Sequence, residues 1–151
     1  MSQSKFVIAW DKFVSPQLNL KHHLGKNRVL PDLNNYLNAM GRHPQVGAKL
    51  KKDYMMFVCN AIRKQLPKLH ITKKVKIHYQ HYEADRKRDP SNCASMATKV
   101  IEDALQTCGV ITNDGWANIA EYSQSFDIDK ENPRIEVYIE EVDSGQIMME
   151  F

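Results

Sequence analysis

The sequence predicts a single small domain of the α+β class, with a mixed sheet of about four strands packed with two main helices. Three observations support this fold class. The chain has 151 residues and 42% hydrophobic residues, enough for one core. Apolar residues alternate in some segments and recur every three or four positions in others. Glycine and proline separate these segments. We expect the domain to span residues 1–142, with 143–151 as a tail that is disordered or contacts a second copy.

The first half should contain two strands and two helices. Lys5 to Trp10 is a strand candidate, followed by a polar loop over 12–28. Pro31 and Asp32 open a short helix through Met40, and Gly41 and Pro44 end it. A longer amphipathic helix covers 46–66, and Pro67 closes it. Residues 74–83 alternate as a second strand.

The second half should contain one helix and two strands. Ser91 or Asn92 can cap a helix whose apolar positions run from Met96 to Cys108, with Gly109 as its stop. Residues 117–128 and 134–142 are strand candidates, and the polar segment 129–133 is predicted to join them as a hairpin loop. Trp10 and Trp116 are both expected in the core.

Cysteine usage and hydropathy indicate a cytoplasmic protein. The three cysteines, Cys59, Cys93 and Cys108, are widely spaced and odd in number, which is typical of reduced packing residues rather than a disulfide framework. No signal-peptide pattern opens the chain, and no apolar run approaches membrane-spanning length. Zinc is not expected, because the histidines lack partners at ligand spacing.

Charge is strongly segregated along the chain. Residues 1–88 contain 18 Lys and Arg against 5 Asp and Glu, a net of +13, and residues 89–151 contain 3 against 13, a net of −10. This asymmetry favours a basic surface for a polyanion such as nucleic acid, next to an acidic part that can hold cations. The alternative is that these lysines and arginines simply solvate helix faces.

Candidate chemistry concentrates in residues 86–116. Asp89 follows three consecutive cations, and Asp114 lies in a polar turn after the predicted helix. Acids in turns at both ends of one helix can converge in space, and converging acids without a cationic partner usually hold a metal.

The motif series in this stretch resembles the RusA family of Holliday junction resolvases. Its members carry Arg-Asp-x-Asp-Asn, a lysine in the following helix, Asp-Ala-Leu on that helix and an Asp-Asp turn after it. The matching residues are Arg88 to Asn92, Lys99, Asp103 to Leu105, and Asn113 with Asp114. Ser91 stands where the family usually has its second aspartate, and Asn113 replaces the first aspartate of the Asp-Asp pair.

The resemblance implies a bacterial or bacteriophage homodimer that binds four-way DNA junctions and cuts two strands with Mg²⁺ or Mn²⁺, in DNA recombination and repair. It implies that Asp89, Asp114 and Asn92 hold the metal, and that Lys99 and Asp103 join the two aspartates in catalysis. Arg86, Lys87 and Arg88 would bind the DNA backbone without reading its sequence.

Several alternatives stay open. Ser91 removes a probable ligand, so the chain could bind junctions while cutting them weakly or not at all. Asp89 and Asp114 could be turn residues alone. Asp103 lies four residues after Lys99 and could form an exposed helix pair with it. Glu83 and Asp85 could replace a ligand, although solvated strand-end positions suit them better.

Overall fold

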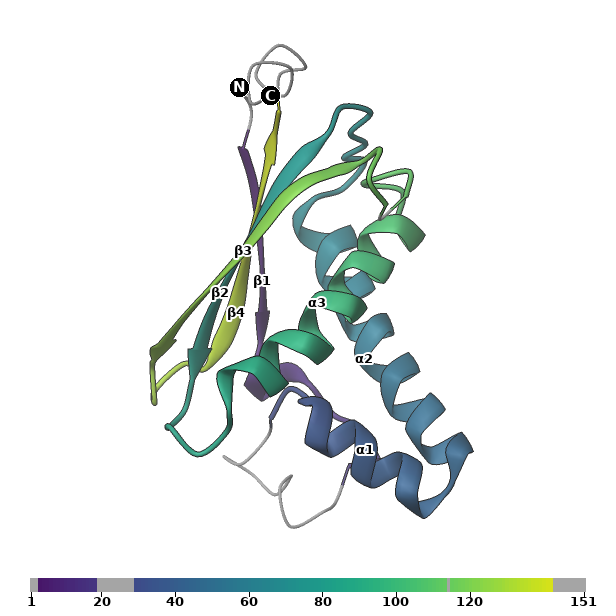
Figure 1. The fold of residues 1–151 in the computed structure, drawn as a ribbon, viewed down its shortest axis with the longest axis vertical. Coiled ribbons are helices and arrows are strands. Elements are labelled where there is room, and N and C mark those ends of the chain that lie inside the picture. The colour runs from purple at the N-terminus through teal and green to yellow at the C-terminus, as the bar shows by residue number, and fades with distance from the viewer. Residues whose placement is uncertain (1–2, 19–28, 114, 143–151) are drawn as a thin grey trace.

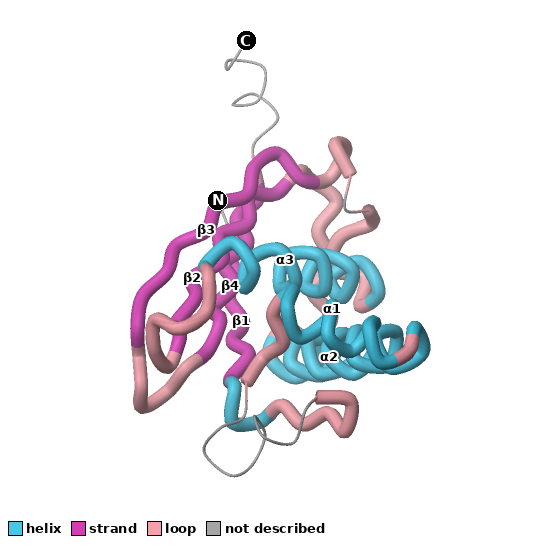
Figure 2. Tube along the Cα trace, turned by 60° about the horizontal axis from the view of Figure 1, so that its bottom comes forward, coloured by secondary structure: helices cyan, strands magenta, loops and turns pink. Residues whose placement is uncertain are grey.

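The computed structural model describes residues 3–18, 29–113 and 115–142 as one sheet covered on one face by helices (Figures 1 and 2). This arrangement confirms the α+β class. No described helix is both long and apolar enough to cross a membrane. In chain order the elements are β1 (Gln3–Ala9), the 3₁₀ turn η1 (Trp10–Lys12), α1 (Leu33–Arg42), α2 (Pro44–Gln65), β2 (Val75–Glu83), α3 (Pro90–Thr107), β3 (Ile119–Ile128) and β4 (Arg134–Glu141).

The sheet is mixed, with the order β1-β4-β2-β3. β2 and β3 are parallel neighbours joined by α3, whereas β4 is antiparallel to both β1 and β2. The prediction of a β3–β4 hairpin was wrong, because residues 129–133 carry the chain past the end of β2. The burial of each strand gives the reason: Ile135, Val137 and Ile139 make β4 a buried central strand, while β3 is mostly exposed and lies at the edge.

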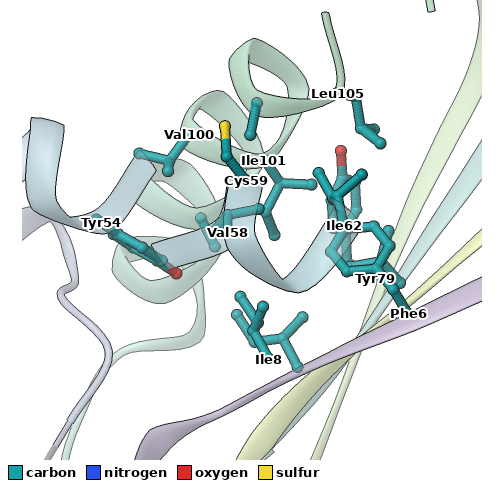
Figure 3. Close-up of a cluster of buried hydrophobic side chains, with 14 of the residues drawn as sticks. Phe6, Ile8, Tyr54, Val58, Cys59, Ile62, Tyr79, Val100, Ile101 and Leu105 are labelled. Carbon is teal, nitrogen blue, oxygen red and sulfur yellow. The ribbon is translucent and has the colours of Figure 1, made fainter. Parts of the chain in front are cut away.

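The core lies between the sheet and the helices (Figure 3). Every second residue of β2, from Val75 to Glu83, is buried, as expected for a strand with one covered face. Phe6 and Ile8 of β1 point to the same side, toward Val58 and Ile62 of α2 and Ile101 of α3. Trp10 is buried as predicted, but Trp116 is 94% exposed, so its expected place in the core was wrong.

Local capping sets the ends of the helices. Asp32 and Asn35 form a capping box at α1, with hydrogen bonds of 2.8 and 2.9 Å. α3 starts two or three residues earlier than predicted, because Pro90 takes the first helical position and Asp89 becomes the N-cap residue. Gly109 follows the end of α3 with φ +75°, the left-handed conformation that favours glycine.

We expect Gly47→Ala to destabilise the fold, against the ordinary preference of helices for alanine. A Cβ at Gly47 would collide with the Met40 side chain and lie 3.2 Å from Met40 Cα, where α1 packs on α2. The overpacking cost of about 1–3 kcal/mol exceeds the propensity gain of about 1 kcal/mol. Gly41→Ala is the control, since nothing lies within 4 Å of its added Cβ. Urea unfolding should rank Gly41→Ala above wild type and Gly47→Ala below it; the reverse ranking would contradict the α1–α2 packing.

Candidate nucleic-acid interface

The N-terminal end of α3 presents three of the predicted site residues to solvent. Arg86, Lys87 and Asp89 are exposed, and Asn92 is half-buried on the first turn of the helix. The backbone carbonyl of Asp89 accepts hydrogen bonds from Asn92 N at 3.1 Å and Cys93 N at 3.2 Å. The Asp89 side chain makes no capping hydrogen bond. Its carboxylate is therefore held at the surface beside two cations.

Arg88, the third cation of the predicted DNA-binding group, is a structural residue in this fold. Its Nε and Nη2 donate to the two carboxylate oxygens of Glu83 at 3.0 and 3.2 Å, and its Nη1 donates to Leu30 O at 2.6 Å. The guanidinium also lies 4.7 Å from the ring centre of Trp10. Arg88 therefore ties the end of β2 to the segment before α1, and its position does not favour a phosphate contact.

The partners of Arg88 form a buried polar cluster behind the surface. Glu83 is buried, so the expectation of a solvated strand-end residue was wrong. Burial lowers the pKa of the Arg88 guanidinium, but the hydrogen bonds and charge of Glu83 outweigh this and leave it raised. Burial also raises the pKa of the Cys93 thiol, whose Sγ donates to Glu83, to about 12. Cys93 is thus a protonated packing residue, not a nucleophile.

Lys99 and Asp103 lie further along α3 and form the ion pair that their spacing predicts. Lys99 Nζ is 3.2 Å from Asp103 Oδ1. Their positions, ten and fourteen residues after Asp89, correspond to about 15 and 21 Å along a helix axis. The structure therefore does not bring these two side chains to the Asp89 carboxylate.

The two ends of the motif series lie at opposite ends of α3. Asp114 lies outside the described residues, but its neighbours are placed: Gly115 N donates to Asn113 Oδ1 at 3.1 Å, and Gly115 O accepts from Asn118 N at 3.1 Å. This turn follows the C-terminal end of the 18-residue α3, and such a helix is about 27 Å long. We expected the turns at the two ends of this helix to lie close together. Asp89 and the placed residues 113 and 115 instead lie a helix length apart.

The donor groups at the N-terminal end of α3 do not by themselves make a magnesium site. Asp89 and Asn92 are the only predicted ligands whose position is described there. Within residues 3–18, 29–113 and 115–142, no three His, Cys, Asp or Glu side chains group closely enough to hold an ion. Among the described residues, Asp89 and Asn92 thus supply two of the three predicted ligands at this end of α3.

A basic helical surface is the feature that the motif analysis did not locate. α1 and α2 together contain six Lys and Arg but a single acid, Asp53, whose carboxylate accepts from Ser15 Oγ at 2.7 Å. Lys49, Lys52 and Arg63 are exposed at spacings of three and eleven residues, which places them on one stripe of α2. The half-chain charge excess predicted a basic surface, and the helical periodicity of residues 46–66 predicted that these cations lie largely on the solvent side of the helix.

Acidic residues predominate in the last two strands of the chain. From Ile119 to Glu141, the two strands β3 and β4 and their connection contain seven Asp and Glu against Lys130 and Arg134. Arg134 is paired with Asp129 and Glu136 at 2.8 Å each. The charge division of the sequence thus becomes a division between helices α1 and α2 and strands β3 and β4.

Comparison of the chain with protein-family models and with curated proteins gave no match. The likeness to RusA resolvases therefore rests on the motif residues themselves.

We expect Arg88→Ala to destabilise the fold by about 3–5 kcal/mol, because it leaves the buried Glu83 carboxylate unpaired. Arg88→Lys should also lose stability, since a lysine cannot form the two-pronged pair. The matched control is Arg86→Ala, an exposed neighbour whose removal should change stability by less than about 0.5 kcal/mol. Chemical denaturation measures all three. Equal effects of Arg86→Ala and Arg88→Ala would rule out the structural role of Arg88.

Proposed function

We propose that the chain is a RusA-like protein that binds four-way or otherwise branched DNA through its helical layer and works as a homodimer. The observation that carries this proposal is the distribution of charge: six cations and one carboxylate on α1 and α2, against an acidic β3–β4 region. Phosphate backbones attract such a surface and are repelled by the opposite one, so the charge division also orients the bound DNA.

The reach of the basic stripe suits a nucleic-acid backbone. Lys49 and Arg63 are fourteen residues apart on α2, which corresponds to about 21 Å along the helix axis. Flexible lysine and arginine side chains at this spacing can contact several phosphates without reading bases. Arg86 and Lys87 add two exposed cations at the N-terminal end of α3.

Lys49→Glu or Lys52→Glu should weaken binding to a synthetic four-way junction and reduce the slope of log K against log salt by about 1 for each lost phosphate contact. The matched control is Lys130→Glu, which makes the same charge change at an exposed position in the acidic region. Fluorescence anisotropy over a salt series gives both quantities. If all three variants lose affinity to the same extent, binding depends on the net charge of the protein and not on the basic stripe of α2.

Paired Mg²⁺-dependent cleavage of junctions is the activity that the motif series supports, and we place it between two subunits. Asp89 and the placed neighbours of position 114 lie at opposite ends of α3. A two-fold dimer that sets the N-terminal end of one α3 against the C-terminal end of the other can supply acids from both ends. Lys99 and Asp103, midway along α3, would lie between the two ends.

Mixing two inactive variants tests this arrangement. Asp89→Asn and Asp114→Asn should each abolish junction cleavage. After subunit exchange between them, half of the dimers are mixed and each has one intact site, so about a quarter of the sites should recover. Gel assays that count nicks per junction measure the recovery. Persistent inactivity of the mixture, with wild type active under the same conditions, would place both acids in one subunit's site.

Binding without efficient cleavage is the second candidate function, and Ser91 favours it. Ser91 is exposed on the first turn of α3, at the position of the family's second aspartate, and offers a hydroxyl where a carboxylate would hold the ion. In that case the wild type binds junctions but leaves them intact, and Ser91→Asp raises cutting. Ordinary cleavage rates in the wild type would eliminate this candidate.

A further inference from the structure

Trp116 is the most exposed large apolar side chain among the placed residues. It is 94% exposed, in the turn between α3 and β3. A tryptophan side chain buries about 150–250 Å² when it packs, and folded proteins generally use that area. Trp116 lies next to Gly115 and Ala117 and does not pack into the core, so its fold role is small. Tryptophan is one of the side chains enriched at binding interfaces.

The surroundings of Trp116 are fixed by backbone hydrogen bonds to the segment before β2. Ile71 N donates to Val110 O at 2.7 Å, and Val75 N donates to Asn118 O at 2.8 Å. The loop that carries Trp116 therefore lies beside residues 69–75. Figure 1 shows both loops at the same end of the molecule, next to the C-terminal ends of α2 and α3.

Four exposed cations belong to this end of the molecule. Arg63 and Lys64 are on the last turns of α2, and Lys68 and Lys73 follow in the connection to β2; all four side chains are exposed. Residues 60–74 contain no Asp or Glu, and residues 107–120 contain only Asp114. We define Trp116 with Arg63, Lys64, Lys68 and Lys73 as the tryptophan end. Its cations continue the basic stripe of α2, because Arg63 belongs to both.

We propose that the tryptophan end binds unpaired DNA, with Trp116 stacking on an exposed base while the neighbouring cations contact its phosphates. An exposed aromatic ring at the same end of the molecule as four exposed cations is the combination that single-stranded nucleic acid requires, because every base offers a flat face and every nucleotide a negative charge. This inference rests on the proposed DNA binding. It adds a preference for sites where base pairing is interrupted, as at the crossover of a branched molecule.

The two tryptophans of the chain differ in whether a DNA base can reach them. Trp10 is 5% exposed, and its ring lies against the Arg88 guanidinium. A base cannot reach that ring. Any quenching of tryptophan fluorescence by stacked DNA must therefore come from Trp116, since the chain contains two tryptophans.

The test compares the full-length wild type with Trp116→Ala and Trp116→Phe on two DNAs of equal length, one fully paired duplex and one with a short single-stranded gap. Trp116→Ala should lose affinity for gapped DNA on the order of tenfold, with little change on the duplex. Trp116→Phe should retain most of the preference. Gapped DNA should quench wild-type tryptophan fluorescence, and this quenching should be absent in Trp116→Phe.

Folding does not obscure the result, because an exposed side chain contributes little to stability. Tyr122→Ala, at an exposed aromatic position on β3, is the matched control and should bind both DNAs as the wild type does. If the wild type binds duplex in a salt-dependent manner but Trp116→Ala keeps the full preference for gapped DNA, the stacking role is wrong and the proposed function stands. If the wild type binds neither DNA at any salt concentration, both are wrong.

Discussion

The parallel pairing of β2 with β3 is the constraint on which the rest of this structure depends. Two parallel neighbours cannot be joined by a tight turn, so the chain must return along the full length of the sheet, and α3 performs this return. The crossover buries Val100, Ile101 and Leu105 against the sheet and α2. It also holds the N-cap residue Asp89 and the turn around Gly115 at opposite ends of the helix. The crossover helix that completes the core therefore also keeps the first and last parts of the motif series apart.

A second consequence concerns the cations of the Arg86-Lys87-Arg88 run. Where β2 ends, the chain must turn into α3 over the buried Glu83 carboxylate, and a buried charge without a partner is costly. Arg88 supplies the partner and binds Leu30 O as well. Arg86 and Lys87 remain at the surface. Three adjacent residues of similar charge therefore have different roles, determined by which one faces the end of the strand.

The proposed DNA-binding residues, the exposed lysines of α2 and Trp116, lie outside the motif series. The exposed lysines of α2 come from a segment that carries no catalytic motif. Trp116 follows the motif turn at residues 113–115 but matches no position of the motif. Both belong to one end of the molecule because the loop after α3 hydrogen-bonds to the segment after α2. This juxtaposition gives the proposed DNA contact an aromatic as well as an electrostatic component.

Local rules in the sequence determined most of the elements. Alternation predicted β2, helical periodicity predicted α1, α2 and α3, and the left-handed Gly109 ended α3 as expected. The excess of positive charge in the first half of the chain also predicted the basic surface of α1 and α2. Only the tertiary structure decided strand order, the role of Arg88, the exposure of Trp116 and the separation of Asp89 from the turn at 113–115. These features depend on contacts between residues far apart in the sequence, such as which strand becomes central and which side chain pairs with a buried charge. Such contacts produce no periodic pattern in the sequence.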